Sequence, residues 1–458
     1  MIEAPSIASR LDALPGGWPV WRLIGLVSLG GCFEFYDLMM TAYITPGLVQ
    51  AGIFHAAKGA LFGQGDPAVF AAATFLGLFI GTVAFSRLAD RYGRRRVFTA
   101  SLIWYALATL GMATSATALQ LHLWRLVSGI GIGVELVTID AYVSEIAPAR
   151  LRGRAFALNQ AIQFTAVPIV AFVCWRLLPL APLGLTGWRW VMLIGGAGAV
   201  AVWFIRARLP ESPRWLERQG RIAEAEQIVR SLEAGGTRRP DPEPPPAVPP
   251  PPPASTRRAL REAFSPRYRR RTVMLVVFNI AQAIGFYGFG NWAPSLIAAR
   301  GHSVTHSLGY AFTIAAAYPV GPLLCLAIAD RFERKAQIIA AAVCTAVLGL
   351  TFSTQTAPVV LIVLGVGVTL SNNLLSYAYH AYQTELYPTR MRSAAVGFVY
   401  AWSRLATVFS SFIIAGLLGA FGAGGVFALI AAAMAVVVLS VGLLGPRTAG
   451  QSLEALSD

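Results

Sequence analysis

The stretch Asp90-Arg91-Tyr92-Gly93-Arg94-Arg95 returns 240 positions later as Asp330-Arg331-Phe332-Glu333-Arg334-Lys335. A second charged segment keeps the same offset, because residues 141–152 match residues 381–392 and place Glu145 opposite Glu385. Two charged motifs held in one register within an apolar chain indicate a duplicated unit, and duplicated membrane units usually enclose a pathway between their two copies. The repeat therefore predicts a membrane transporter.

The composition indicates that the chain is folded in a lipid bilayer. Of its 458 residues, 56% are hydrophobic and only 13% are charged, which is far from the balance of a soluble domain. Apolar runs long or dense enough to cross a bilayer occupy residues 70–84, 97–116, 191–205, 338–350, 359–370 and 426–444. By this length criterion there are about twelve spans. The predicted fold is an all-α polytopic membrane protein with twelve transmembrane helices in two pseudo-symmetric six-helix halves.

The net charge of +15 is distributed by side of the membrane. Arginines and lysine follow spans two, four, eight and ten, while the intervening connections carry few of them. The positive-inside rule then places both termini and the even-numbered connections on the cytoplasmic side of the cell (inner) membrane. Nucleic-acid binding, which such a charge would suggest in a soluble protein, is not expected.

Three parts are predicted along the chain: a six-helix bundle at 1–209, a cytoplasmic linker at 210–270, and a second bundle with a short tail at 271–458. Within the linker, residues 211–234 have the charge pattern of an amphipathic helix, and residues 240–253 form a proline-rich spacer. A partner that recognises polyproline is an alternative use of this spacer, although two bundles need a linker in any case. We expect a monomer whose partners are the lipid bilayer, a small-molecule substrate and protons.

The four cysteines and five histidines are dispersed, and none has the spacing of a metal site or of a disulfide framework. The sequence also offers no nucleophile with a base and no phosphate-binding loop. We therefore expect no enzymatic activity, no cofactor and no metal.

The Asp90-Arg91 turn is predicted to act as a latch. An acid followed by a cationic cluster at a helix end can pair with a neighbouring helix in one conformation and release it in another. The simpler interpretation is that these arginines only hold the loop on the cytoplasmic side. Recurrence of the acid at Asp330 favours the latch. The residues predicted to gate are Asp90, Arg91, Arg94, Arg125, Glu145, Arg152, Asp330, Arg331, Glu385 and Arg392.

Glu34 and Asp37 lie three residues apart in the first span and therefore on one helix face. Inside a membrane such acids are costly unless they are paired, hydrated or protonated. Either acid alone is equally well explained as the partner of an arginine. The pair, together with Glu135 and Asp140 in span four near Arg125, favours proton coupling by these four acids.

Arg404 lies deep in span eleven, where a guanidinium has no lipid-facing explanation and offers a planar fork suited to a carboxylate. Its alternative partner is an internal acid. Polar and aromatic side chains in spans five, seven and ten are predicted to complete a binding site, although about half of such amides are simple interhelical hydrogen bonds. These side chains are Asn279, Gln282, Tyr287, Asn291, Gln160, Gln163, Asn373 and Tyr377.

Several motifs together resemble the major facilitator superfamily, in its sugar-porter-like division. Residues 88–95 resemble the signature loop between spans two and three, residues 125–133 the span-four motif, and residues 145–153, 210–216 and 385–390 the motifs of the division. The tail at 446–454 resembles the end motif, although Arg447 and Ala449 replace its usual Glu and Lys. Ser86 and Glu333 replace glycines of the family pattern, so the second latch is expected to be weaker. The resemblance covers nearly the whole chain and implies two halves that rock about a central path.

The resemblance also narrows the substrate class. An arginine at the position of Arg404 marks the organic-anion branch of the division, and the Glu34 and Asp37 pair resembles span one of proton-coupled aromatic-acid, nicotinate-type and metabolite carriers. The paired glutamines and tyrosines of sugar carriers are missing from span seven. We predict import of a small organic anion, an aromatic or other monocarboxylate, by proton symport with alternating access. The alternatives are a carrier of a neutral sugar or polyol, an efflux pump of the same fold, and a non-transporting receptor that docks a partner through its proline-rich segment.

Overall fold

The computed structural model describes residues 7–14, 16–55, 65–85, 88–207, 209–234, 256–328 and 332–448, and this part of the chain is helical apart from short connections. Ten of its helices are long and apolar enough to cross a membrane. Helices are the expected form, because every backbone N–H and C=O inside a bilayer must be paired within its own segment.

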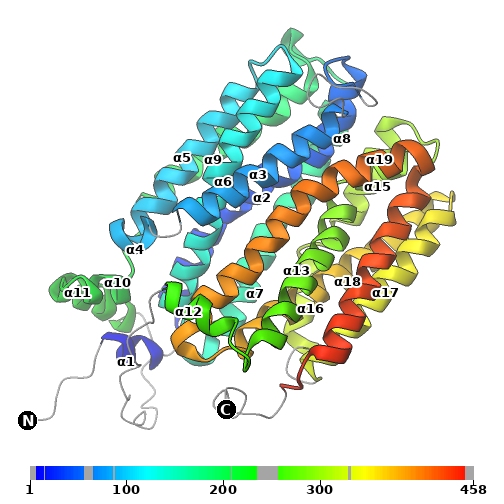
Figure 1. Ribbon diagram of the computed structural model, residues 1–458. Helices are drawn as coiled ribbons and strands as arrows, with labels where there is room; N and C mark the ends of the chain where they lie inside the picture. Colours follow the sequence, from blue (N-terminus) through cyan, green and yellow to red (C-terminus); the bar gives the residue numbers. More distant parts are fainter. Residues whose placement is uncertain are drawn as a thin grey trace, which may run out of the picture.

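Six spans precede the linker. They are α2 (Trp18–Gln50), α3 (Asp66–Phe85), α5 (Arg94–Met112), α6 (Ala118–Ile146), the pair α7 (Arg152–Phe164) and α8 (Ala166–Leu177), and α9 (Gly187–Arg206). The helix α5 is less apolar than the others because three arginines open it, and it packs along α6 and α9 (Figure 1). Short 3₁₀ turns, η1 (Ala149–Leu151) and η2 (Pro182–Gly184), lie in the connections.

Six spans follow the linker. They are α13 (Arg269–Gly290) with its continuation α14 (Ala293–Ala298), the pair α15 (Val304–Ala315) and α16 (Val320–Ile328), α17 (Arg334–Thr354), α18 (Pro358–Glu385), and the two arms of α19 (Thr389–Leu444). The chain reverses within α19 at Gly422, whose φ of 64° suits a residue without a Cβ (Figure 1). With α5 and both arms of α19 counted, the described part of the chain holds twelve spans.

Short helices lie at one end of the molecule (Figure 1). They are α1 (Ile7–Asp12), α4 (Leu88–Tyr92), α10 (Pro213–Arg218), α11 (Ile222–Ala234) and α12 (Thr256–Ala263). The single amphipathic helix predicted over 211–234 is wrong, because Gly220, with a φ of 75°, separates α10 from α11. The proline-rich spacer at 240–253 lies outside the described residues.

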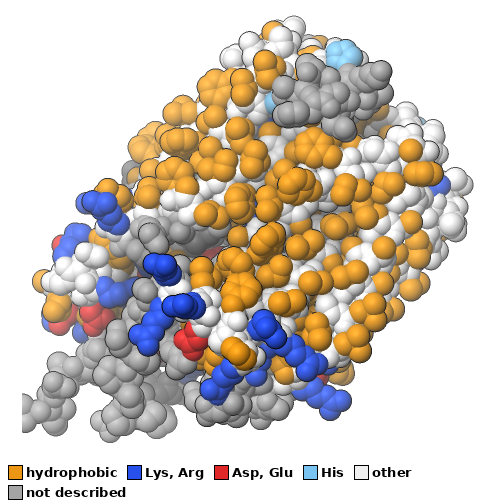
Figure 2. All heavy atoms as spheres, in the orientation of Figure 1, with side chains coloured by type: hydrophobic (Ala, Val, Ile, Leu, Met, Phe, Trp, Pro, Cys, Tyr) orange, Lys and Arg blue, Asp and Glu red, His pale blue; other side chains and the backbone are white. Residues whose placement is uncertain are grey.

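Lysine and arginine side chains gather at this same end, which we call the basic end (Figure 2). Hydrophobic side chains cover most of the remaining face shown in Figure 2. Large apolar residues such as Leu107 and Phe409 are 58% and 60% exposed, which would be costly in water and is normal against lipid. The protein is a multi-pass membrane protein.

The two bundles meet along paired helices. The helix α3 of the first bundle lies along α19 of the second, and α8 lies along α15 (Figure 1). Aromatic rings make part of this contact, with centroids 4.7 Å apart for Phe75 and Tyr287 and 5.8 Å apart for Trp175 and Phe312. Ring contacts contribute dispersion without a fixed polar geometry.

Within the first bundle, α3 and α6 touch at backbone distance. A Cβ built on Gly129 would lie 2.5 Å from the Thr74 carbonyl oxygen, and one built on Gly77 would lie 2.5 Å from that of Leu126. Glycine at these positions allows the close approach. The two helices therefore form a tightly packed pair that fixes the side chains on both of them.

Candidate functional site

Asp37 of α2 is held by three side chains from other helices. Its Oδ2 lies 3.0 Å from Arg125 Nη1 and accepts the Ser128 hydroxyl at 2.5 Å, both from α6. Its Oδ1 accepts the Thr109 hydroxyl of α5 at 2.7 Å. Asp37 is 2% exposed and Arg125 is completely buried, so this ion pair is sealed from water in this conformation.

Arg125 is further held by neutral groups. Its Nε donates to Thr74 Oγ1 at 3.0 Å, and its other nitrogens reach the Thr41 hydroxyl and backbone carbonyl oxygens of α2. The guanidinium also lies 5.6 Å from the centre of the Phe70 ring. The sequence groups Arg125 with the gating residues, but the structure places its side chain with Asp37 in the interior of the first bundle.

Glu34, one turn from Asp37 on α2, has no such support. It is completely buried, and neither of its carboxyl oxygens has a hydrogen-bond partner in the described part of the chain. The charges of Glu135, Asp140, Arg206 and Arg404 act on it. The two acids of span one therefore occupy different environments although they share one face of the helix.

Glu135 lies apart from Arg125, contrary to the expectation from sequence. It forms a completely buried ion pair with Arg206 of α9, which the sequence analysis missed. Arg206 also donates to the Val27 carbonyl, and its guanidinium lies against Gly30, where any Cβ would collide with it. An arginine at the end of an apolar run was the available signal, but it is also what topology alone produces.

Asp140 lies one helical turn and a half from Glu135 on α6 and is exposed. Its Oδ1 accepts a long hydrogen bond from Asn159 at 3.5 Å, and Asn159 also bonds Gln163, at 3.3 Å. The charge of Arg404, in the other bundle, acts on Asp140. Asp140 is therefore expected to face the space between the bundles rather than lipid. Gln160, on the same helix as Gln163, is half-buried.

Arg404 is the central charge of the second bundle. It is 3% exposed, and its guanidinium donates to the hydroxyl groups of Tyr287 and, at 2.8 Å, Tyr400. The same guanidinium lies 5.6 Å from the Tyr287 ring centre and 4.9 Å from that of Tyr400. Within the described residues, no carboxylate forms an ion pair with Arg404. Its positive charge is solvated by two phenols and two aromatic faces.

More aromatic side chains extend this group along α18. His380 lies 4.1 Å from Tyr379 and 5.4 Å from Tyr400 between ring centres, and His380 is itself exposed. Gln282 of α13 donates to the Tyr379 hydroxyl at 3.4 Å. Sequence reasoning selected Gln282 but missed Tyr379 and Tyr400. The spacing of Tyr400, one turn before the arginine of span eleven, was the signal that could have found it.

Two other predicted binding residues donate to backbone carbonyls. Asn279 donates to the Leu275 carbonyl in its own helix at 2.8 Å, and Asn373 donates to the Tyr318 carbonyl at 3.2 Å. Asn291 is buried at the end of α13, and Tyr377 on α18 is half-buried. The first two are interhelical or intrahelical hydrogen bonds of the kind expected for about half of such amides.

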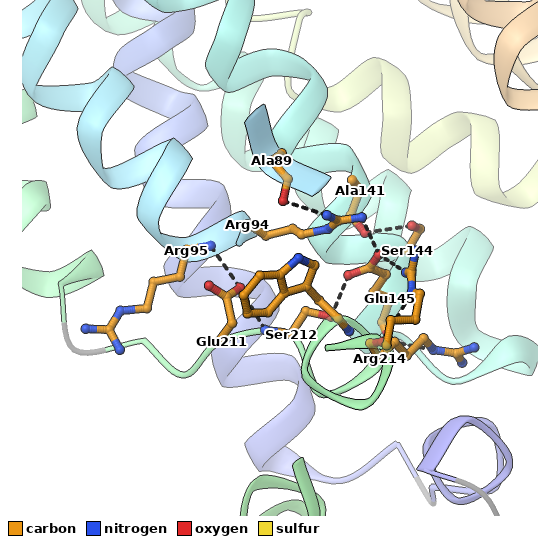
Figure 3. A network of polar contacts seen from close by, with 11 residues as sticks. Ala89, Arg94, Arg95, Ala141, Ser144, Glu145, Glu211, Ser212 and Arg214 are labelled. Carbon is orange, nitrogen blue, oxygen red and sulfur yellow. Dashed lines mark hydrogen bonds and ion pairs between the residues drawn. The ribbon is translucent and has the colours of Figure 1, made fainter. Parts of the chain in front are cut away.

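At the basic end, Glu145 is the hub of a polar network (Figure 3). Its Oε1 lies 3.0 Å from Arg94 Nη2 and 2.7 Å from Arg218 Nη2, and its Oε2 accepts the Ser212 hydroxyl. Arg94 also donates to the Ala89 carbonyl at 2.7 Å, which joins α5 to α4. The network thus ties the ends of α4, α5 and α6 to the linker helix α10.

The geometry at the start of α5 explains why position 93 is a glycine. Gly93 has a φ of 101°, and a Cβ there would collide with the carboxylate of Glu211. That carboxylate accepts the backbone N–H of Arg95 at 3.0 Å (Figure 3). A glycine is therefore required for the linker to dock on the start of α5.

The second copy keeps part of this network. Arg334 lies 2.6 Å from Glu385, which reproduces the Arg94 to Glu145 pair at the same 240-residue offset. Arg392 donates to the Tyr387 carbonyl at 3.2 Å, and Arg152, its counterpart, lies 3.3 Å from Asp12 of α1.

The residues predicted to form the latch itself are only partly placed. Arg91 is exposed and lies over the Tyr92 ring. Asp330, Arg331 and the Asp90 side chain lie outside the described residues. The latch formed by the acid of each copy therefore stays a prediction.

Twelve spans in two bundles, with charged side chains buried in both, define a secondary transporter of the major facilitator fold. A family model described as "Sugar (and other) transporter" matches residues 23–458. The chain belongs to this sugar (and other) transporter family.

Relatives of the chain are named for the transport of metabolites. The niacin transporter NiaP of Acinetobacter baylyi is 28% identical over 98% of this chain and 99% of its own length. The inner membrane metabolite transport protein YdjE of Escherichia coli is 28% identical over 100% of both chains. The gallate transporter of Pseudomonas putida is 27% identical over 90% of this chain and 89% of its own.

The fold is also that of a solved transporter. The partially occluded inward open structure of the xylose transporter XylE from Escherichia coli matches with a TM-score of 0.74 at 19% identity, over 94% of this chain and 99% of that one. The predicted fold class, twelve helices in two six-helix halves, is confirmed.

Proposed function

We propose that the protein imports a small organic anion, an aromatic or other monocarboxylate, together with protons, by alternating access of two rocking bundles. The observation that carries this proposal is Arg404. A buried guanidinium without a carboxylate partner is costly in a membrane protein and is normally retained for function. Its planar fork matches a carboxylate, and the two phenols that now hold it are weaker partners that an anion can displace.

The neighbours of Arg404 support an aromatic substrate. Tyr287, Tyr379, His380 and Tyr400 present ring faces and edges around the guanidinium. A benzoate-like or pyridine-like ring would stack among them while its carboxylate meets Arg404. The relatives named for niacin and gallate favour the same class.

The acids of the first bundle support proton coupling. Asp37 is paired with Arg125, so protonation of Asp37 would release that arginine and the α2 to α6 contact it makes. Glu34 is buried with no hydrogen-bond partner among the described residues, so its neutral, protonated form is the less costly one. Asp37 is the proposed principal proton site and Glu34 the second, with Glu135 held by Arg206 in support. XylE, the solved transporter whose fold this chain shares, is named as a proton:xylose symporter.

The basic end is the proposed cytoplasmic side of an inner membrane protein, as for the relative YdjE, which is named as an inner membrane protein. The pairs Arg94 to Glu145 and Arg334 to Glu385 are the proposed gating contacts there. Each joins two spans of one bundle and would break or reform where those two spans shift against each other during the rocking of the bundles.

Uptake into proteoliposomes tests the proposal. Radiolabelled nicotinate, gallate and benzoate are offered with an inward proton gradient, with xylose as the neutral competitor, and protein-free liposomes measure passive entry of the undissociated acid. Accumulation of an aromatic acid above the protein-free level, by up to about tenfold per pH unit for one proton per anion, is the expected result. Accumulation of xylose alone, or uptake of the acid that ignores the gradient, would overturn it.

A further inference from the structure

A second polar cluster lies at the end of the molecule opposite the basic end, and the proposed function does not use it. Asp66 is the first residue of α3, and its Oδ1 lies 3.2 Å from Nε2 of His122 on α6. Its Oδ2 accepts the backbone N–H of His55 at 2.8 Å and lies 3.5 Å from the Nδ1 of that residue. One carboxylate therefore joins two imidazoles from different parts of the chain.

The two imidazoles differ sharply in their access to water. The side chain of His55 is 70% exposed, whereas those of His122 and Asp66 are 4% and 1% exposed. A proton can pass from solvent into the protein along an exposed histidine, a buried carboxylate and a buried histidine that contact one another in that order. Each transfer crosses a single contact, and imidazole is the side-chain group best suited to exchange protons near neutral pH.

A purely structural explanation accounts for only part of this geometry. A buried histidine is often simply satisfied by one carboxylate, and the contact between His122 and Asp66 would suffice for that. His122 Nδ1, however, is also buried and has no hydrogen-bond partner among the residues that the structure describes. Burying a ring nitrogen without a hydrogen bond costs free energy, and packing does not explain why the protein retains it. A role for that nitrogen in a second proton transfer would explain it.

The cluster lies one helical turn from the arginine that holds the proposed proton site. His122 and Arg125 are three residues, about 4.5 Å of rise, apart on α6. Phe70 bridges them, with its ring centre 6.1 Å from that of His122 and 5.6 Å from the Arg125 guanidinium. Phe54 stacks on His122 with ring centres 5.4 Å apart and itself lies 5.3 Å from the Phe70 ring centre.

Among the described residues, the ionisable groups near His122 come from three elements. Asp66 of α3 contacts His122 directly, and His55, in the connection before α3, contacts Asp66. Arg125 lies one turn along α6 and is paired with Asp37 of α2. The faces of Phe54 and Phe70 carry no charge. A positive charge on His122 would therefore be balanced by Asp66 and would repel Arg125.

We propose that His55, Asp66 and His122 form the proton-uptake route from the outer side of the membrane to Asp37. The inference rests on the proposed proton symport. A hydronium ion protonates the His55 imidazole and leaves water, and the proton passes to the Asp66 carboxylate and on to His122 Nε2. The imidazolium then releases the proton on Nδ1 toward Asp37 and returns to neutral imidazole. Protonated Asp37 no longer neutralises Arg125, and the route is reset when the neutral His122 imidazole changes tautomer, its remaining proton moving from Nε2 to Nδ1 so that Nε2 can accept from Asp66 again.

The test is the dependence of uptake on external pH. Wild type, His122→Gln and Asp66→Asn are compared in proteoliposomes, and His306→Gln serves as the matched control, because His306 is a histidine stacked on Tyr310 in the other bundle. Gradient-driven uptake of nicotinate or gallate is measured over external pH, and counterflow exchange is measured at equal pH on both sides. Melting temperature in detergent checks that each variant is folded.

The proposal expects His122→Gln and Asp66→Asn to lose about 10- to 100-fold in gradient-driven uptake and to flatten its external pH profile, because a positioned proton donor contributes about 100-fold or more. Counterflow and the His306→Gln profile should stay at wild-type values. A folded His122→Gln or Asp66→Asn with the wild-type pH profile overturns the route. Equal loss of counterflow and driven uptake also overturns it, since it shows a structural role. If wild-type uptake itself ignores the gradient, the proton symport fails rather than the route alone.

Discussion

Replacing Arg404 with glutamine should remove most of the affinity for a carboxylate while sparing a neutral analogue. Gln keeps a hydrogen-bond donor but ends two atoms short of the guanidinium nitrogens and carries no charge, so the proposed anion would be left in a site whose remaining partners are phenols. Removing one partner of a buried charge pair costs about 3–5 kcal/mol, which corresponds to roughly 100- to 4,000-fold in dissociation constant. Arg404→Lys keeps the charge and loses the planar fork, so it should cost about 1.5–3 kcal/mol, or roughly 10- to 100-fold.

Binding is best measured as the rise in melting temperature that a ligand causes in the purified protein. This stabilisation follows mass action, and the measurement assumes no direction of transport. Nicotinate and nicotinamide form a matched pair, because they share the ring and differ in charge. The reasoning requires a large loss for the acid, an intermediate loss in Arg404→Lys, and little change for the amide. Equal losses for acid and amide, or an acid that still binds Arg404→Gln at wild-type concentration, would refute an anion site at this residue.

Three further outcomes follow from the contacts. Asp37→Asn removes the proposed proton carrier but keeps a hydrogen-bonding side chain, so gradient-driven accumulation should be lost while counterflow is retained; equal loss of both would assign Asp37 to binding or folding. Tyr400→Phe removes the 2.8 Å partner of Arg404 and should lower the melting point of the free protein by the equivalent of about 1–3 kcal/mol, and an anionic ligand that replaces that partner should then raise the melting point more than in wild type. Gly129→Ala places a methyl group 2.5 Å from a carbonyl of α3 and should cost about 1–3 kcal/mol, whereas Gly153→Ala, with nothing within 4 Å, should be neutral in the same melting experiment.

The fold followed from sequence because its signals are local or repeated. Apolar runs of spanning length need no knowledge of their neighbours, and the 240-residue offset carried over into the matching pairs Arg94 to Glu145 and Arg334 to Glu385. The amphipathic helix over 211–234 failed for an equally local reason. A single glycine, Gly220, takes a positive φ that the charge pattern does not reveal.

The partners inside the membrane were harder to predict. Which arginine meets which acid depends on the rotation and depth of each helix, and a spacing of three residues does not fix either. Glu135 and Arg206 pair across α6 and α9, while Glu34 is left without a partner although it shares a face with Asp37. The type of residue at the site was predictable; the pairing was set by packing.

The backbone contact between α3 and α6 gives this transporter a direct mechanical link between its two proposed ligand sites. The helix α6 carries Arg125, the partner of the proposed proton site, and α3 carries Phe75, whose ring touches the tyrosine bound to Arg404. Because glycines leave no room for the two helices to slide independently, a change at one site reaches the other as movement of a single body. Thermodynamic reciprocity then applies: whatever factor the proton adds to the affinity for the anion, the bound anion must add to the affinity for the proton.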